Sequence, residues 1–134
     1  MYAKTKATNK MKAKNIFERL LNGVAVPFND PEYFKIGDAC THTRKLLVKL
    51  NNEPDLDKAR TLLNDITASQ IDETTTIFPP FQINYGKNTK ICKNVFINFD
   101  CTFLDLGGIT IEDGVLIAPK VSILSEGHPV APGE

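Results

Sequence analysis

Apolar residues recur every six positions through the last third of the chain. In most of these units a small or β-branched residue follows four positions later. A helix repeats every ~3.6 residues and a strand every ~2, so this period fits neither a helix nor an ordinary hairpin. It is typical of a parallel β-solenoid, in which the chain turns a corner after each unit and stacks coil on coil. The first set is Ile91, Ile97, Phe103, Ile111, Ile117 and Ile123, and the second is Val95, Cys101, Gly107, Val115, Val121 and Gly127.

The two sets of three hexads are out of phase, because Phe103 and Ile111 are eight positions apart. The extra residues lie near residues 106–108, where we expect a loop to protrude from one corner. The pattern predicts two coils of about 18 residues, after an irregular first coil over residues 81–89. Solenoids need caps at both ends. Because no cap follows the last hexad, the sequence favours a fragment over a chain whose last coil is covered by another chain.

The first half of the chain has helical periodicity instead. Asp30, Pro31 and Glu32 predict a helix start, since Asp caps a helix, Pro suits its first turn and Glu favours its dipole. One amphipathic stretch precedes this start and two follow it. We therefore expect a flexible tail over residues 1–11, a helical domain over residues 12–71 and the first solenoid coils over residues 72–134.

Composition narrows the function classes. The chain has 16 Lys and Arg against 16 Asp and Glu, so net charge favours neither nucleic acid nor an anionic membrane as a partner. No apolar stretch approaches the ~18 residues of a membrane span, and the N-terminus lacks a secretory signal. The three cysteines, Cys40, Cys92 and Cys101, give no disulfide framework or zinc pattern. We expect buried thiols in a reducing cytoplasm.

A histidine follows the last hexad directly. His128 lies between Gly127 and Pro129. An imidazole titrates near neutrality, so His128 is a candidate general base. The alternative is an ordinary loop histidine. His42 lies among polar residues in a predicted helix, and we expect it at the surface.

Several stretches resemble the maltose and galactoside O-acetyltransferases, a family of hexapeptide-repeat acyltransferases. They are residues 79–88, which begin Pro-Pro-Phe, residues 95–105, which contain Asn-Phe, and residues 111–121, followed by Gly127-His128-Pro129. The helical region with Asp30-Pro31-Glu32 is similar to that family's N-terminal domain. The resemblance covers nearly everything from about Lys12 onward.

The resemblance implies a mainly β fold with some α: a left-handed parallel β-helix preceded by an N-terminal helical domain. It implies a cytoplasmic homotrimer that transfers acetyl from acetyl-CoA to a sugar or glycoside hydroxyl, with no nucleic-acid or membrane partner. The segment at Pro27-Phe28 departs from the family pattern, and Cys92 replaces a usual Gly. The family's later coils, which form much of the acetyl-CoA groove, do not occur in these 134 residues.

The resemblance also places site residues. His128 maps onto the catalytic histidine and Asn98 onto an acceptor-binding asparagine. Asp105 is the nearest match to an acidic pocket residue, though the alignment can shift by one. Tyr85 can line the acceptor pocket. Each of these three residues also has a structural alternative. Asn98 can be a corner residue in a left-handed conformation, and Asp105 a solvated loop residue. Tyr85 can pack at the junction of helices and solenoid.

Other functions stay open at this point. The chain can be a truncated, non-catalytic fragment of a sugar acetyltransferase, or a xenobiotic acetyltransferase on the same solenoid. The helical domain disfavours the second of these. A zinc hydro-lyase on a solenoid needs three histidines around one metal. With His42 and His128 alone, one chain cannot supply them.

Overall fold

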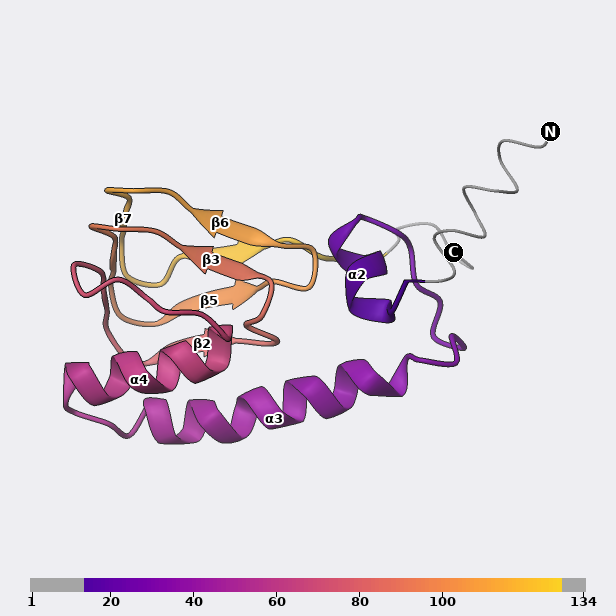
Figure 1. The fold of residues 1–134 in the computed structure, drawn as a ribbon, viewed down its shortest axis with the longest axis horizontal. Coiled ribbons are helices and arrows are strands. Elements are labelled where there is room, and N and C mark those ends of the chain that lie inside the picture. Colours follow the sequence, from indigo (N-terminus) through magenta and orange to yellow (C-terminus); the bar gives the residue numbers. More distant parts are fainter. Residues whose placement is uncertain (1–13, 129–134) are drawn as a thin grey trace.

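The computed structural model describes residues 14–128 and shows helices followed by short strands. The tail expected over residues 1–11 and Pro129 lie outside these residues. The helices are α2 (Ile16–Leu21), α3 (Phe34–Leu50) and α4 (Leu56–Thr67) (Figure 1). The strands are β1 (Thr76–Ile77), β2 (Phe81–Ile83), β3 (Thr89–Ile91), β4 (Phe96–Ile97), β5 (Cys101–Leu104), β6 (Ile109–Ile111), β7 (Leu116–Ile117) and β8 (Ser122–Leu124).

All strand pairs are parallel, and they form three narrow sheets in the described part of the chain. The sheets have the orders β1-β4-β7, β2-β5-β8 and β3-β6. Thr76 pairs with Phe96, and Phe96 with Leu116, so each coil lies 20 residues after the one before. This arrangement confirms the parallel solenoid. The predicted coil length of about 18 residues was too short by one two-residue step.

The two additional residues lie in a longer corner between β2 and β3, which recurs between β5 and β6. Ile83 and Ile91 are separated by the same eight positions as Phe103 and Ile111. Strands β2 and β3 therefore pair in register with β5 and β6, and the first coil is regular where we had expected an irregular one. The loop expected to protrude at residues 106–108 does not protrude. Leu106 is buried there.

Inward side chains stack in columns along the solenoid. Ile91, Ile97, Ile111 and Ile117 are buried as predicted, while Ile123 is partly buried and packs against the same core. The second set of inward sites is only partly right, because Gly107 and Gly127 lie in the corner and Ile109 on β6 is buried instead. The three-coil columns are Thr75-Val95-Val115, Ile77-Ile97-Ile117, Phe81-Cys101-Val121 and Ile83-Phe103-Ile123.

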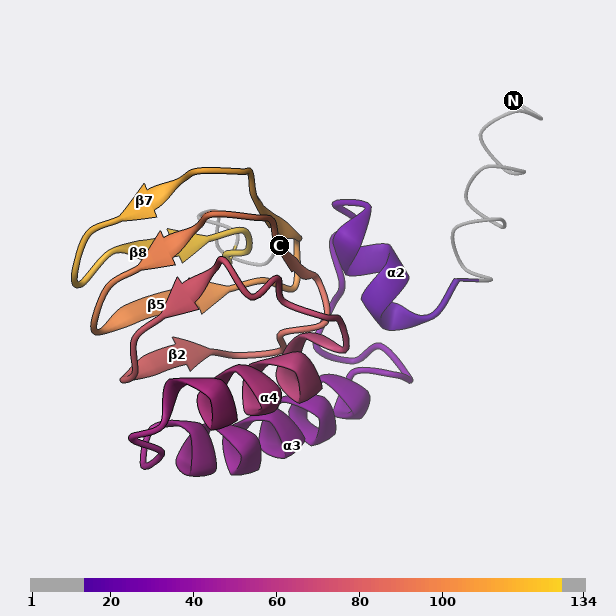
Figure 2. The same cartoon turned by 60° about the vertical axis from the view of Figure 1, so that its left-hand side comes forward.

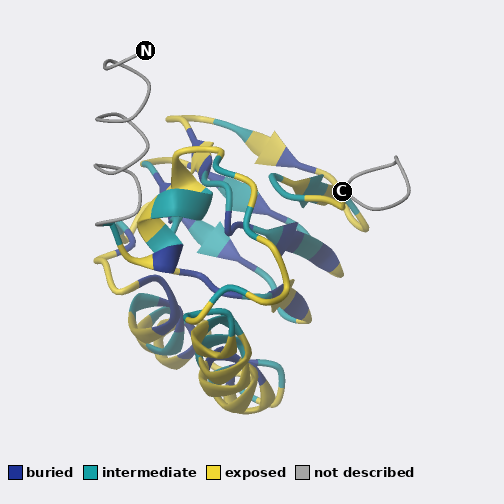
Figure 3. Ribbon diagram, turned by 90° about the vertical axis from the view of Figure 1, so that its right-hand side faces the viewer, coloured by how far each residue is buried: buried dark blue, intermediate teal, exposed yellow. Residues whose placement is uncertain are grey.

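Helices α3 and α4 lie against the first coil (Figures 1 and 2). Their buried residues join the solenoid core, while their outer faces are exposed (Figure 3). Side chains from this pair also bond the backbone of the first coil. Asn51 accepts from Phe81 N at 2.8 Å and donates to Phe81 O at 3.0 Å, as a neighbouring strand would. The helices therefore cap the first coil.

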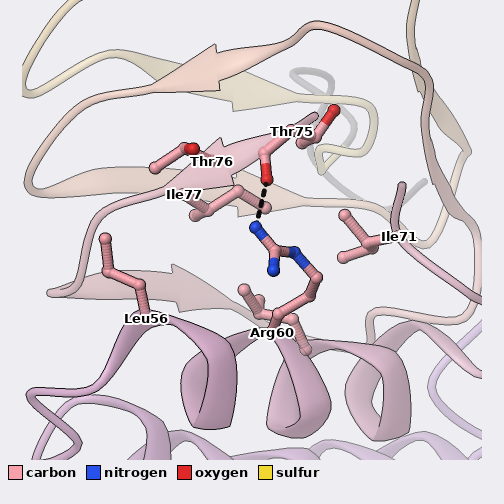
Figure 4. Close-up of a pocket in the computed structure, with 7 residues that line it drawn as sticks. Leu56, Arg60, Ile71, Thr75, Thr76 and Ile77 are labelled. Carbon is pink, nitrogen blue, oxygen red and sulfur yellow. Dashed lines mark hydrogen bonds between the residues drawn. The ribbon is translucent and has the colours of Figure 1, made fainter. Parts of the chain in front are cut away.

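Arg60 on α4 makes a similar contact with the strand that opens the solenoid. Its guanidinium donates to the carbonyl of Thr75 at 3.1 Å (Figure 4). It also donates to the carbonyl of Glu73 at 3.2 Å. The space under this side chain has a volume of only about 10 Å³. That volume holds at most one water molecule. The helix–solenoid junction at α4 is therefore packed and does not offer a ligand site.

The predicted start of α3 is three residues early, because Tyr33 and not Asp30 directly precedes the helix, which begins at Phe34. Asp30 opens a turn before it, and its carboxylate accepts from Glu32 N at 2.9 Å. The same carboxylate pairs with Arg19 of α2 through two hydrogen bonds of 2.5 and 3.0 Å. This pairing lowers the pKa of Asp30 to about 2, with the Arg19 hydrogen bond as the largest cause. Asp30 therefore joins two helices and does not cap α3.

Candidate active site at one corner of the solenoid

One corner of the solenoid carries three of the four predicted site residues. It consists of residues 84–88, 105–108 and 125–128, which follow β2, β5 and β8 in successive coils. We call it the Asp105 corner. Gly107 allows a close approach between coils, because a Cβ there would lie 2.1 Å from the carbonyl oxygen of Ser125. The stacked loops therefore touch through their backbones.

The carboxylate of Asp105 is fully buried at this corner. Its Oδ1 accepts from Tyr85 N at 3.2 Å and from Gly86 N at 2.9 Å. Its Oδ2 accepts from Asn88 N at 3.1 Å and from the Thr89 hydroxyl at 2.8 Å. Four donors of the first coil thus converge on one side chain of the second. Asp105 holds the two coils together, and its oxygens are occupied by the protein itself.

A second carboxylate extends this network to the last coil. Glu126 accepts from Leu106 N at 3.1 Å through Oε2 and from the side-chain amide of Asn84 through Oε1. Asn84 in turn accepts from Asp105 N at 3.0 Å. Burial raises the pKa of Glu126, while the bonds from Asn84 and Leu106 oppose the rise. Glu126 is therefore a partly buried acid that is tied to both coils beneath it.

His128 lies at the exposed edge of the corner, two residues beyond Glu126. Its ring centroid is 6.1 Å from that of Phe28, which is itself 5.4 Å from the ring of Tyr33 in an edge-on contact. Phe28 and Tyr33 come from the segment that precedes α3. The imidazole is accessible to solvent and has an aromatic wall on one side.

Tyr85 packs at the junction between helices and solenoid. Its ring stacks on Phe17 of α2, with 4.6 Å between centroids and an interplanar angle of 5°. The carbonyl of Tyr85 accepts from the Thr43 hydroxyl of α3 at 2.8 Å. Burial raises the pKa of the phenol. Tyr85 thus lies near the site, and its ring serves packing.

Asn98 lies at a different corner, formed by residues 78–80, 98–100 and 118–120. We call this the Phe99 corner. The side chain of Asn98 accepts from Phe99 N at 2.9 Å. The left-handed conformations at this corner belong to Asp100 and Lys120, each with φ of 61°. The four residues of β5 separate Asn98 from the Asp105 corner, a span of ~13 Å at ~3.3 Å per residue. One chain therefore does not bring Asn98 and His128 together.

The Phe99 corner is apolar. Phe99 is 48% exposed and stacks on Phe78, with ring centroids 5.0 Å apart. Phe78 also meets Phe96 edge-on at 5.1 Å. A groove of about 350 Å³ adjoins these rings and extends to the loop between α3 and α4, with Asn51, Asn52, Glu53, Pro54, Leu56, Pro79 and Pro80 completing its lining.

Other predicted features are placed as follows. His42 is exposed on α3. The three cysteines are free; Cys101 is buried, whereas Cys40 and Cys92 are partly buried, against the expectation of full burial. Within residues 14–128, no group of three His, Cys, Asp or Glu side chains could hold a metal ion. In the same range, no helix is long and apolar enough to cross a membrane.

Sequence reasoning missed Glu126 and Phe28 as residues of this corner. Glu126 lies outside the hexad pattern, and its partners come from earlier coils. Phe28 falls in the segment that departs from the family pattern. The signal that could have found Glu126 is its separation of two residues from His128, which places both side chains on one side of an extended segment.

Comparison with known proteins gives consistent relatives. The chain is 37% identical over 76 residues to the galactoside O-acetyltransferase of Escherichia coli K12, covering 57% of this chain and 37% of that protein. A maltose O-acetyltransferase from Clostridium difficile 630 superposes with a TM-score of 0.78 at 29% identity, covering 90% of this chain and 63% of that one. A hexapeptide-repeat acetyltransferase from Vibrio cholerae, solved with acetyl coenzyme A, gives a TM-score of 0.66 at 26% identity over 78% of this chain and 55% of that one.

These relatives confirm the resemblance predicted from the sequence. No family model matches the chain. The chain spans less than two thirds of the length of each of these three proteins.

Proposed function

Because the chain is related in sequence and fold to the hexapeptide-repeat acetyltransferases of the galactoside and maltose O-acetyltransferase kind, we propose that it is an acetyl-CoA-dependent O-acetyltransferase acting on a sugar hydroxyl. The observation that carries the proposal is the match to a maltose O-acetyltransferase over 90% of the chain, at a TM-score of 0.78. We propose the left-handed sense of the solenoid on the same ground. The cytoplasm is the proposed compartment, in keeping with the three free cysteines.

In this proposal His128 is the general base. The acceptor hydroxyl gives its proton to the imidazole as its oxygen attacks the thioester carbonyl carbon. The tetrahedral intermediate then collapses, the carbon–sulfur bond breaks, and the imidazolium returns the proton to the coenzyme A thiolate. The products are the acetylated sugar and free coenzyme A. An exposed imidazole beside Phe28 suits a base that must reach two large substrates.

Acetyl-CoA is the proposed donor, since a related acetyltransferase was solved with that molecule. His128 lies at the open edge of the Asp105 corner, where a thioester can approach from outside the coil. The coenzyme would supply the activated acetyl group, and the chain's own contribution is the base and the acceptor contacts.

A homotrimer completes the proposal. Asn98 and His128 lie at different corners, so a site that uses both requires a second copy of the chain. The outward face of β1-β4-β7 carries Thr76, Phe96 and the 76% exposed Leu116, and the face of β2-β5-β8 carries Gln82, Thr102 and Ser122 beside Leu104 and the 59% exposed Leu124. Exposed apolar side chains of this kind suit contact between copies. Sedimentation at several protein concentrations tests the assembly, and a monomer throughout would contradict it.

Acetyl transfer itself is tested by release of free coenzyme A thiol with galactosides, glucosides and maltose as acceptors. Both the 134-residue chain and the protein purified from its native source are assayed. The proposal predicts thiol release that depends on the acceptor and yields an acetylated sugar by mass. Thiol release without acceptor acetylation, or none with any acceptor, would contradict it.

A further inference from the structure

Among residues 14–128, Glu126 is the acid near His128 with oxygen atoms left to bind a ligand. Each of its carboxylate oxygens accepts a single hydrogen bond from the protein, one from Leu106 N and one from Asn84. An ionised carboxylate offers about four acceptor positions. The neighbouring Asp105 is fully buried and already accepts four hydrogen bonds. Among the two acids of this corner, Glu126 therefore has the open capacity.

We propose that Glu126 binds the acceptor, by accepting a hydrogen bond from a hydroxyl next to the one that is attacked. The inference rests on the proposed acetyl transfer to a sugar. It replaces Asp105, the acid predicted from the sequence, with a residue whose carboxylate is partly exposed and two positions from the base. The acceptor class that follows is a ring with adjacent hydroxyl groups.

Two further features of the corner support this assignment. Asn84 and Leu106 fix the carboxylate from below, so its position is set before a ligand arrives, which lowers the entropy cost of binding. Phe28 and Tyr33 place aromatic surface beside His128. Sites for small molecules combine apolar and aromatic walls with a few fixed polar groups. Glu126, His128 and Phe28 together have that composition.

A purely structural role would use only the two hydrogen bonds from Leu106 N and Asn84, one to each carboxylate oxygen. Burial disfavours the ionised form of this acid, as the raised pKa of Glu126 indicates. Acids held in this way are found preferentially at functional sites. Asp105, His128 and Cys40 are the charged or titratable groups that interact electrostatically with Glu126.

The test compares Glu126→Gln with Glu112→Gln, the same change at an exposed site on a different corner. Binding of methyl galactoside, methyl glucoside and maltose is titrated by calorimetry without acetyl-CoA. We expect Glu126→Gln to weaken the best of these ligands roughly tenfold or more, as for loss of a hydrogen bond to a charged group. Glu112→Gln should bind like the unmodified chain. Equal affinities for all three proteins would overturn the proposal, as would no binding by the unmodified chain.

A second arm uses mono-deoxy analogues of the best ligand. For one analogue, the affinity of the unmodified chain should fall to about the affinity that Glu126→Gln has for the intact glycoside. The affinity of Glu126→Gln itself should fall little further with that analogue, because the hydrogen bond is already lost. A uniform loss across every analogue, with a raised KM for acetyl-CoA, would mean a structural role and overturn the proposal. Where Glu126→Gln does not fold, Glu126→Asp takes its place under the same criteria. Glycoside binding that depends on Glu126 in a protein without acetyl transfer would contradict the proposed function and leave this inference standing.

Discussion

The Asp105 corner and the Phe99 corner turn the same chain with different chemistry. At the first, a fully buried carboxylate gathers four hydrogen bonds and joins successive coils. At the second, aromatic rings stack at the surface, and Asp100 and Lys120 take left-handed conformations at equivalent positions. One corner is fixed by internal polar bonds and the other leaves apolar surface uncovered. We expect the first to support a precisely positioned base and the second to meet another copy of the chain.

The largest expected effect is that of Asp105→Ala. The change leaves the N–H groups of Gly86 and Asn88 and the Thr89 hydroxyl without their acceptor, whereas Tyr85 N keeps the side-chain oxygen of Asn84 at 3.0 Å. At ~1–3 kcal/mol for each unsatisfied donor, and allowing for relaxation, the free energy of unfolding should fall by about 4 kcal/mol or more. Urea denaturation measures the loss.

The matched control is Asp100→Ala at the Phe99 corner. Asp100 is exposed, and its φ of 61° makes the cost that of a left-handed alanine, about 1 kcal/mol. Similar losses at Asp105 and Asp100 would remove the difference between the corners.

Truncation in the core of the last coil comes next. Ile117 stacks on Ile97 and Ile77 and is 7% exposed. Ile117→Ala should lower the free energy of unfolding by roughly 2–5 kcal/mol, as for other core truncations. Its neighbour Leu116 is 76% exposed, so Leu116→Ala should cost less than about 0.5 kcal/mol in a monomeric sample. A larger loss for Leu116→Ala than for Ile117→Ala would show that the assignment of inward and outward positions is wrong by one residue.

Gly107→Ala tests the close approach of coils at the Asp105 corner. The added Cβ would lie 2.1 Å from the backbone oxygen of Ser125, which cannot move without shifting the last coil. The free energy of unfolding of Gly107→Ala should therefore fall by about 2–3 kcal/mol, near the upper end of the costs of overpacking a core.

The control for that change is Gly37→Ala, on the exposed face of α3 with nothing within 4 Å of the added Cβ. It should stabilise the chain by about 0.5–1 kcal/mol. Thermal melts of the two variants should therefore shift in opposite directions, and a stabilised Gly107→Ala would contradict the stacked corner.

The smallest effect is a pH dependence at Glu126. Its pKa is raised in the folded state, so the folded chain binds this proton more tightly than the unfolded chain. Stability from this group therefore increases as pH falls through the folded pKa, and is fully gained below the unfolded value near 4.5. Glu126→Gln should remove that increase. Urea denaturation from pH 7 to pH 4 measures it, and unchanged pH profiles would mean that Glu126 is not buried in solution.

The two corners also differ in how well sequence predicts them. Burial along a strand repeats locally, so the hexads identified inward residues such as Ile97 and Ile117. The coil length was missed because the large Phe81, in the first coil, does not resemble Cys101, the small residue stacked on it. Partners of Asp105 and Glu126 come from coils 16 to 42 residues earlier. No local pattern specifies such bonds, so the predicted role of Asp105 came from a resemblance.

Our account rests on His128 as the base, and one comparison tests that most directly. Acetyl transfer from acetyl-CoA to the best glycoside acceptor is measured for the native protein, His128→Ala and His42→Ala. His42 is exposed on α3, so its variant should keep full turnover. His128→Ala should lower kcat by ~10²–10⁴-fold, the range for a lost general base, with little change in the KM for acetyl-CoA. Full turnover in His128→Ala would contradict the proposed mechanism.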